Sequence, residues 1–338
     1  MFQEVKKAIE AAKRIVVIQA ENPDGDSLGS ALGLEEILGD LGKDVVLYCP
    51  VNIPRYLGYI KGWDRVVDEL PKDFDLTIVV DTASATLMER AIVPANLSRI
   101  SAKPAIVLDH HITEGTLPFE HLAITDPKMV ATGELIVNLA DKNAWPINPQ
   151  AAEHLAISIL SDSLGLMTEN TSSASIHTVA RLVELGASLA TIENRRRDFM
   201  KKSPEILEYK GRLLQRIEYY LDGALAIVHI PWEEIAEYSD QYNPSVLVID
   251  EMRLVTGVRV AIALKTYPDG KITGKIRGNP NAKVAETIAS YFGGGGHPYV
   301  AGFRTHSDDY QAVKAELIGT VDKVLAEYDT TITTTEPC

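Results

Sequence analysis

Short apolar runs alternate with amphipathic segments along the first half of the chain. Four of these runs are rich in β-branched residues and are bounded by polar or turn-forming residues, which is typical of buried strands. They cover residues 15–18, 45–48, 77–80 and 105–108. Between the first two, residues 27–40 place their apolar positions on one broad face, which predicts a helix. Alternating strands and helices favour a parallel sheet with helices on both faces.

A second alternation begins near residue 222, after a mainly helical region and a charged segment of helical period at 203–221. Strands are expected at 224–230, 255–265 and 271–277, and helices near 284–291 and 308–327. We therefore expect an α/β protein with a smaller second α/β domain. The expected parts are an N-terminal domain at 1–187, a helical linker at 188–221, a C-terminal domain at 222–328 and a flexible tail at 329–338.

Polar side chains follow the ends of three expected strands. Asp24 and Asp26 lie in the turn "ENPDGDSLGS" after the first strand, Asp81 follows the third, and the tripeptide "DHH" at 109–111 follows the fourth. The carboxyl ends of parallel strands share one edge of a sheet, where such proteins bind ligands. Asp162, near the end of a predicted helix, completes the set.

Carboxylates and an imidazole in this combination suit Mn²⁺ or Mg²⁺. Two such cations roughly 3.5–4 Å apart assist phosphoryl transfer in many enzymes. The candidate ligands are Asp24, Asp26, Asp81, His110 and Asp162. Taken alone, each aspartate has a structural alternative as a helix cap or Asx turn, so the prediction depends on their convergence.

A run of four glycines followed by His297 lies between an expected helix and an expected strand. It is either a flexible connector or a ligand-binding loop. Its place inside a compact domain favours ligand contact, because glycines let backbone N–H groups approach a phosphate. Arg277, at the end of a strand, is a candidate for bidentate phosphate binding, with a solvated surface arginine as the alternative.

The amino-acid composition limits which classes of ligand this protein is expected to bind. The 338 residues carry a net charge of −14, which disfavours long duplex nucleic acid and favours small polyanions at a focused site. Two cysteines are too few for a disulfide framework. No apolar run reaches the roughly 20 residues that span a bilayer, and the N-terminal segment predicts an amphipathic helix rather than a signal peptide. We expect a cytoplasmic protein without membrane partners.

Five motifs together resemble the DHH phosphoesterases, in the subgroup with a DHH-associated C-terminal domain. In chain order they are "NPDGDSLGS" at 22–30, "VVDTA" at 79–83, "DHH" at 109–111, "SDSLGL" at 161–166 and "GGGGHPYVAGF" at 293–303. "KIRG" at 275–278 is similar to an Arg-containing strand of that family. Any one motif is weak, but their order and spacing are highly specific.

The resemblance implies a two-domain enzyme with a cleft between the domains and two Mn²⁺ ions in the first. By this analogy Asp24 and Asp81 bind one metal, and Asp26, Asp81, His110 and Asp162 bind the other. Asp109 would orient the metal ligands without binding a metal itself, and His111 would contact the scissile phosphate. The C-terminal domain would hold the nucleotide through Arg277, Gly294, Gly295, Gly296 and His297.

The resemblance also implies substrates. A chain of this size is similar to the subgroup of oligoribonucleases and pAp phosphatases, whose members act on very short RNAs, 3′,5′-bisphosphate nucleotides, or cyclic dinucleotides and their linear products. A homodimer is an expectation from the family.

One residue departs from the family pattern. The usual first motif carries a histidine three residues before the proline, where this chain has Ala20. Alanine cannot ligate a metal, and strand alternation points Gln19 and Glu21 elsewhere. The first metal site is then one ligand short. Two hypotheses follow. The first is the metal-dependent phosphoesterase that the resemblance implies. The second is a nucleotide-binding protein of the same fold with impaired turnover, whether the alanine is natural or engineered.

Overall fold

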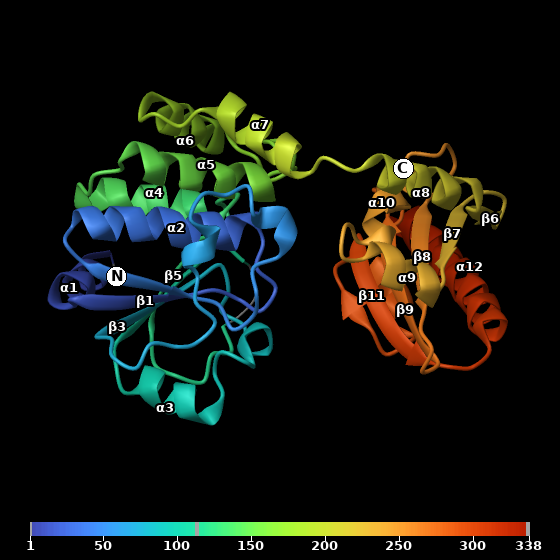
Figure 1. The fold of residues 1–338 in the computed structure, drawn as a ribbon, viewed down its shortest axis with the longest axis horizontal. Helices are drawn as coiled ribbons and strands as arrows, with labels where there is room; N and C mark the ends of the chain where they lie inside the picture. The colour runs from blue at the N-terminus through green and yellow to red at the C-terminus, as the bar shows by residue number, and fades with distance from the viewer. Residues whose placement is uncertain (1, 112–114, 336–338) are drawn as a thin grey trace. The chain divides into compact units, whose positions relative to one another are not determined.

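The computed structural model describes residues 2–111 and 115–335, and the chain divides into two compact units, Met1–Lys201 and Lys202–Cys338 (Figure 1). The residues expected to form a linker are shared between the two. Helix α7 (Leu189–Phe199) belongs to the first unit and α8 (Pro204–Gln215) to the second. Each unit is described by itself.

The first unit is built on a five-stranded sheet in the order β2-β1-β3-β4-β5, with every neighbouring pair parallel. The strands are β1 (Arg14–Ile18), β2 (Asp44–Tyr48), β3 (Leu76–Val80), β4 (Ala105–Asp109) and β5 (Leu122–Thr125). The predicted parallel α/β sheet is confirmed. Only β5 was not expected; it has four residues, of which only Ile124 is buried, so the sequence signal for a strand is short.

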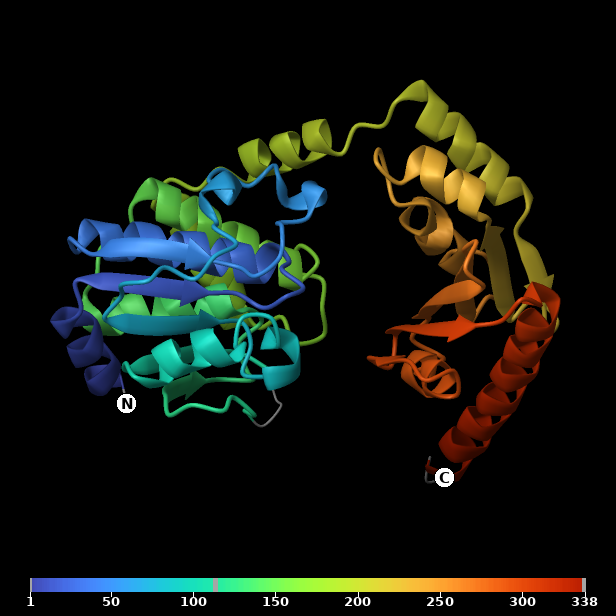
Figure 2. The same cartoon turned by 60° about the horizontal axis from the view of Figure 1, so that its bottom comes forward.

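Helices cover both faces of this sheet, as Figure 2 shows. One face packs on the layer of α1 (Phe2–Ala11), α2 (Gly25–Asp40), α4 (Thr132–Asn143) and α5 (Pro149–Asp162), and the other packs on α3 (Pro94–Ser101). Helices α6 (Ser173–Glu184) and α7 pack on α5. A Cβ atom at Gly29 of α2 would lie 2.7 Å from the His154 carbonyl oxygen of α5. Glycine therefore permits the close α2–α5 packing.

Three short 3₁₀ helices lie in the loops of the first unit: Arg55–Leu57, Trp63–Arg65 and Ala85–Met88. They belong to the connections that follow β2 and β3. Loops at the carboxyl ends of parallel strands are where such folds place functional residues.

The second unit has a six-stranded sheet in the order β10-β11-β9-β8-β7-β6, in which only the β7–β8 pair is parallel. The strands are β6 (Glu218–Tyr220), β7 (Leu225–Ile230), β8 (Val260–Thr266), β9 (Lys271–Gly278), β10 (Gly295–Gly296) and β11 (Val300–His306). A separate α/β unit in this half was expected. Its strand β8 begins at Val260 rather than Val255, because a turn occupies the residues in between.

Two apolar cores lie on opposite faces of the second sheet. One face packs on α11 (Ala285–Ser290) and α12 (Tyr310–Thr335), the long red helix of Figure 2. The other packs on α8, α9 (Trp232–Tyr238) and α10 (Pro244–Arg253), chiefly over β7 and β8. Residues 329–335, expected to be a flexible tail, continue α12, and residues 336–338 lie outside the described residues.

Candidate functional site

The turn after β1 is fixed by a capping box. Asp24 Oδ1 accepts hydrogen bonds from the backbone N–H groups of Asp26 and Ser27, both at 3.0 Å, and Ser27 Oγ accepts one from Asp24 N at 3.0 Å. This cap starts α2 and places Asp26 in its first turn. Among the described residues, the groups of donors close enough to share one cation do not include Asp24. Its role as a ligand stays a prediction.

Asp26 is only 1% exposed and is held by α4 and α5. Its Oδ2 accepts from Thr132 N at 2.8 Å, and its Oδ1 accepts from Ser158 Oγ at 2.5 Å and from Gly133 N at 3.3 Å. Ser30 Oγ, one turn along α2, donates to the same Oδ1 at 3.0 Å. Backbone donors at a helix N-terminus stabilise a negative charge, so the carboxylate is fixed in place.

Asp81 follows β3 with a backbone φ of +63°, a left-handed conformation that is uncommon outside glycine. Its N–H donates to the Leu108 carbonyl of β4 at 2.9 Å, and its Oδ1 accepts from Thr132 Oγ1 at 3.0 Å. The neighbouring strand and α4 therefore hold both ends of the residue. Such constrained residues gather at functional sites.

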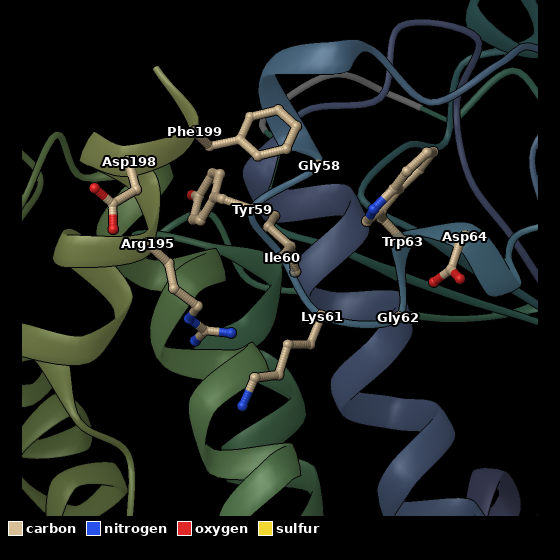
Figure 3. A pocket seen from close by; sticks show the side chains of 10 residues that line it. All are labelled: Gly58, Tyr59, Ile60, Lys61, Gly62, Trp63, Asp64, Arg195, Asp198 and Phe199. Carbon is tan, nitrogen blue, oxygen red and sulfur yellow. The ribbon is translucent and has the colours of Figure 1, made fainter. Parts of the chain in front are cut away.

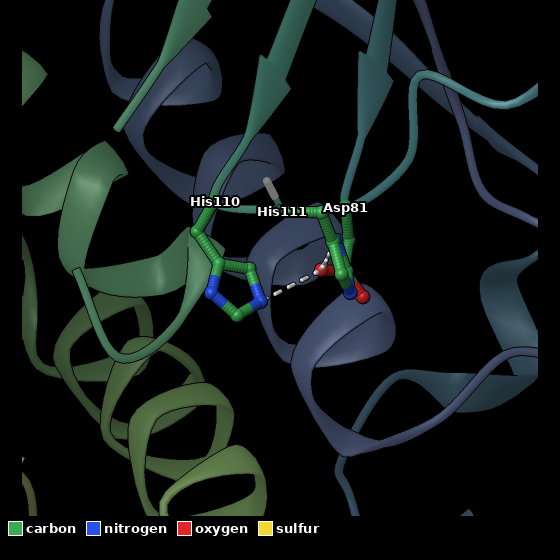
Figure 4. A group of neighbouring side chains, drawn as sticks. All are labelled: Asp81, His110 and His111. Carbon is green, nitrogen blue, oxygen red and sulfur yellow. Dashed lines mark ion pairs between the residues drawn. The ribbon is translucent and has the colours of Figure 1, made fainter. Parts of the chain in front are cut away.

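His110, directly after β4, brings the predicted ligands together. Its Nε2 lies 3.5 Å from Asp26 Oδ2, 3.6 Å from Asp81 Oδ1 and 3.5 Å from Asp162 Oδ2. Figure 4 shows its ring turned toward Asp81. Its Nδ1 lies 3.3 Å from the Met129 carbonyl, so the tautomer that donates there leaves the Nε2 lone pair facing the carboxylates.

The electrostatics of this cluster favour a cation. Burial first, and then the neighbouring Asp26, raise the pKa of Asp81 well above its usual value and also raise the pKa of Asp162. Burial raises the pKa of Asp24 as well. Buried carboxylates that repel one another are stabilised by a positive charge among them. The donor set of one imidazole and several carboxylates fits Mn²⁺ or Mg²⁺.

His111 points a second imidazole at the same edge, but it is held differently. Its Nδ1 lies 2.7 Å from Asp109 Oδ1 and 3.9 Å from Asp81 Oδ1, and its side chain is 48% exposed. Figure 4 shows His111 beside Asp81. The hydrogen bond with buried Asp109 raises the pKa of His111. The Asp109 side chain thus orients His111 and leaves its Nε2 edge for a ligand.

The structure shows the surroundings of Ala20, which stands where the family pattern has a histidine. Ala20 is 5% exposed, and its carbonyl accepts from Cys49 Sγ at 3.4 Å. Glu21 is paired with Arg90, with 3.6 Å between Oε2 and Nε. Gln19 is fully buried, and within the described part of the chain neither polar atom of its side chain has a hydrogen-bond partner. Glu21 is therefore engaged elsewhere.

The second unit contains a polar hollow of about 450 Å³ beside β9 and β11. Of the predicted nucleotide-binding residues, Arg277, Gly295 and Gly296 line it, whereas Gly294 and His297 are not among the described residues that do. Gly294 packs against β11, where a Cβ atom would lie 2.2 Å from the Gly302 carbonyl oxygen. Within the glycine run, Gly295 and Gly296 form the short edge strand β10, which pairs with β11.

The lining residues that were not predicted from the sequence include Lys265, Tyr267 and Lys275. Lys275 could have been predicted from strand alternation, because Lys275 and Arg277 are two residues apart on β9 and share a face. In the same way, the partners of Asp26 on α4 and α5 were not predicted, because nothing local marks Thr132 or Ser158 as contacts.

A larger hollow in the first unit, about 620 Å³, is lined by residues 58–64 and by Arg195, Asp198 and Phe199 of α7 (Figure 3). None of the candidate metal ligands lines it. The predicted metal ligands therefore gather outside this hollow. Among the described helices, none has the length and apolar character that crossing a membrane requires.

Comparisons with known proteins identify the family of this chain. Residues 14–159 match the family described as "DHH family, N-terminal domain". The "Bifunctional oligoribonuclease and PAP phosphatase NrnA" of Thermus thermophilus is 30% identical over 309 residues, which cover 89% of this chain and 86% of that protein. The "Cyclic-di-AMP phosphodiesterase GdpP" of Bacillus subtilis is 24% identical, over 87% of this chain and 45% of that protein.

Solved structures give the same result for the fold. An exopolyphosphatase-related protein from Bacteroides fragilis matches with a TM-score of 0.84 at 21% identity, covering 98% of this chain and 97% of that one. At this identity the likeness shows the fold alone.

Proposed function

Because this chain belongs to the DHH family, we propose that it is a divalent-metal-dependent phosphoesterase acting on short oligoribonucleotides, dinucleotides or pAp. One observation carries the proposal. The buried Nε2 of His110 has no hydrogen-bond partner among the described residues, yet it lies within 3.6 Å of carboxylates from three separate elements. A histidine lone pair facing carboxylates is unfavourable unless a cation lies between them.

We assign the cation to His110, Asp26, Asp81 and Asp162, with Asp24 as an additional ligand. When bound, a divalent cation supplies positive charge that polarises a phosphoryl oxygen and lowers the pKa of water. Mn²⁺ is the proposed ion because an imidazole donor suits it better than Mg²⁺. The Asp26 and Asp81 carboxylates are held before binding by Thr132, Ser158 and the N-terminus of α4, so little reorganisation of these two opposes ligation.

The chain's own residues account for substrate handling. His111, with its Nδ1 hydrogen-bonded to Asp109, presents Nε2 for a phosphoryl oxygen, and its raised pKa favours the donating, protonated form. In the second unit, Arg277 and the Gly295–Gly296 strand are the proposed nucleotide contacts. The relatives' names mention oligoribonucleotides, PAP and cyclic di-AMP, and the net charge of −14 favours such small substrates over duplex DNA.

The test is hydrolysis of pApA, pAp and cyclic di-AMP by the full chain with Mn²⁺, with Mg²⁺ and with EDTA. We expect product with Mn²⁺, less with Mg²⁺ and none with EDTA. His110→Ala should abolish hydrolysis, whereas His177→Ala, which removes an exposed histidine of α6, should not. Full activity of His110→Ala, or activity in EDTA, would refute the metal-site assignment.

Ala20 favours a second candidate, a nucleotide-binding protein with little turnover. In that case the chain would bind one of the three nucleotides tightly and hydrolyse none of them at saturating Mn²⁺. The same assay, combined with calorimetric binding, separates the two candidates. The homodimer and the cytoplasmic location stay predictions from the sequence.

A further inference from the structure

Three helices of the first unit approach one another closely around a single serine, Ser158 of α5, which is fully buried. A Cβ atom at Gly29 of α2 would lie 3.0 Å from Ser158 Cβ, and one at Gly133 of α4 would lie 2.0 Å from Ser158 Oγ. Any side chain at Gly133 would therefore displace the hydroxyl. The two glycines leave the space that Ser158 occupies beside Asp26.

The neighbours of Ser158 orient its hydroxyl toward Asp26. The Gly133 N–H is shared between Ser158 Oγ, at 3.0 Å, and Asp26 Oδ1, at 3.3 Å. Ser30 Oγ of α2 lies at donor distance from the same two oxygens, 3.3 Å from Ser158 Oγ and 3.0 Å from Asp26 Oδ1. Because Ser158 Oγ accepts from its neighbours, its own proton is available for Asp26 Oδ1, which lies 2.5 Å away.

The two carboxylate oxygens of Asp26 differ in their remaining capacity to accept. A carboxylate has about four lone-pair sites, two on each oxygen. The three donors to Oδ1, at 2.5, 3.0 and 3.3 Å, fill its sites. Oδ2 accepts from Thr132 N at 2.8 Å, and the described residues supply no other donor to it. Oδ2 is also the oxygen that lies 3.5 Å from His110 Nε2, so its open site belongs to the charged cluster.

An aspartate with one open oxygen discriminates between cations. Ca²⁺ takes about 6–8 oxygen ligands in a flexible arrangement and often binds both oxygens of a carboxylate. Mg²⁺ and Mn²⁺ suit octahedral sites, for which one oxygen from each carboxylate is enough. Asp26 therefore meets the requirement of the smaller cations and withholds one ligand from Ca²⁺.

We propose that Ser158 is a positioning residue that fills Oδ1 of Asp26 and leaves Oδ2 as the one oxygen of this carboxylate open to a cation. This role rests on the proposed function, because it requires a cation among Asp26, His110 and Asp162. Ser158 itself touches no cation in this arrangement. Its contribution is to fix which oxygen of Asp26 is offered, and thereby to favour Mn²⁺ over Ca²⁺.

The test is titration calorimetry of the full chain with Mn²⁺ and with Ca²⁺, without nucleotide. Ser158→Ala removes a donor to Oδ1, so the carboxylate can turn and offer both oxygens. We expect the Mn²⁺ affinity to fall about 10-fold, the lower end of the range for loss of a residue that hydrogen-bonds to a metal ligand. The Ca²⁺ affinity should fall less than about 2-fold or rise. A purely structural role would lower both affinities together.

Ser175→Ala is the matched control. Ser175 is equally buried, and its hydroxyl donates at 3.1 Å to Glu134, a carboxylate outside the candidate ligand set. Its loss should lower the melting temperature in EDTA to a similar degree and leave both metal affinities within about 2-fold. Circular dichroism checks folding. If Ser158→Ala does not fold, Ser30→Ala supplies the test, because it removes another donor to Oδ1 and should lower the ratio of Mn²⁺ to Ca²⁺ affinity at least about 3-fold.

Two results separate the role of Ser158 from the metal site itself. If the wild type binds Mn²⁺ but Ser158→Ala leaves its affinity unchanged, or lowers the Mn²⁺ and Ca²⁺ affinities equally, the role of Ser158 is overturned and the proposed metal site stands. A wild type that binds no Mn²⁺ would overturn the proposed metal site, and the role of Ser158 with it.

Discussion

The two units gather charges of opposite sign. In the first, Asp26, Asp81 and Asp162 surround the Nε2 of His110, and in the second, Lys265, Lys275 and Arg277 share one hollow. Burial raises the pKa of Asp81 and lowers that of Lys265, because in both cases it disfavours the charged form. Each cluster is therefore suited to a ligand of the opposite charge.

The clusters differ in rigidity. The Asp26 carboxylate accepts hydrogen bonds from the backbone of α4 and from Ser158, which fix both of its oxygens. The lysines of the second unit extend from strands on long side chains, and Lys265 has one polar contact, to Asn243. A metal site needs fixed distances, whereas a phosphate site tolerates adjustable donors. The difference in rigidity between the clusters thus matches the different geometric requirements of a metal ion and a phosphate.

The largest expected effect comes from removing charge in the first unit. Asp81→Asn keeps the shape and an acceptor for Thr132 Oγ1 but removes a proposed metal ligand. Loss of a residue that only hydrogen-bonds to a metal ligand costs about 10–100-fold in metal affinity or activity. We therefore expect the loss of Asp81 itself to lower Mn²⁺-dependent hydrolysis by more than about 100-fold. Without metal, the melting temperature should rise, because the raised pKa means that ionised Asp81 destabilises the fold.

Steady-state hydrolysis of pApA and calorimetric melting in EDTA measure both effects. Asp73→Asn is the control, since Asp73 is an exposed aspartate just before β3. It should change neither quantity. A drop in melting temperature of metal-free Asp81→Asn would contradict the view that this cluster opposes folding.

The second effect concerns pH and is confined to the first unit. His154 of α5 is 3% exposed, its Nε2 lies 3.0 Å from the Lys61 carbonyl, and burial lowers its pKa to about 4. Between pH 6.5 and 4 the unfolded chain binds a proton that the folded chain does not, so stability falls as the pH falls through this window. The loss should reach about 3 kcal/mol by pH 4. His154→Gln should lack this component of the loss.

Urea unfolding monitored by tryptophan fluorescence measures this loss. A Trp232→Phe background leaves Trp63 and Trp145, both in the first unit, as the reporters. The free energy of unfolding is compared in this background with and without His154→Gln. If the two curves run parallel from about pH 7 to about pH 4, the buried histidine is not held neutral in the folded chain.

The sequence predicts features of this molecule that are local, and it misses those that depend on distant contacts. The strands of the first sheet are apolar β-branched runs, and the chain order of Asp26, Asp81, His110 and Asp162 is visible in the motifs. The hydrogen bonds to Asp26 join residues 106 and 132 positions apart, for which no local pattern exists. The edge strand β5 was missed because it has only four residues, Leu122–Thr125, and of these only Ile124 is buried.

Ala20→His tests the one departure from the family pattern. A further imidazole beside Asp24 should raise Mn²⁺ affinity by about 10–100-fold, the range observed when metal-site partners are changed. Titration calorimetry with Mn²⁺ measures it. Ala20 is buried, so Ala20→Leu is the control that adds volume without a donor. Equal Mn²⁺ affinities for the histidine variant and the wild type would show that Ala20 does not stand at a ligand position.

The smallest expected effect separates the two units most directly. Arg277→Ala removes one cation from the hollow of the second unit, and we expect pApA to bind about 10-fold more weakly in EDTA. The Mn²⁺ affinity should not change, because no candidate metal ligand lies in that unit among the residues that the structure describes. Titrations of the same preparation with pApA and with Mn²⁺ measure both quantities. A change in Mn²⁺ affinity would contradict the separation of the two sites, since Arg277 would then act on the metal cluster. An unchanged affinity for pApA would show that Arg277 does not contact the nucleotide.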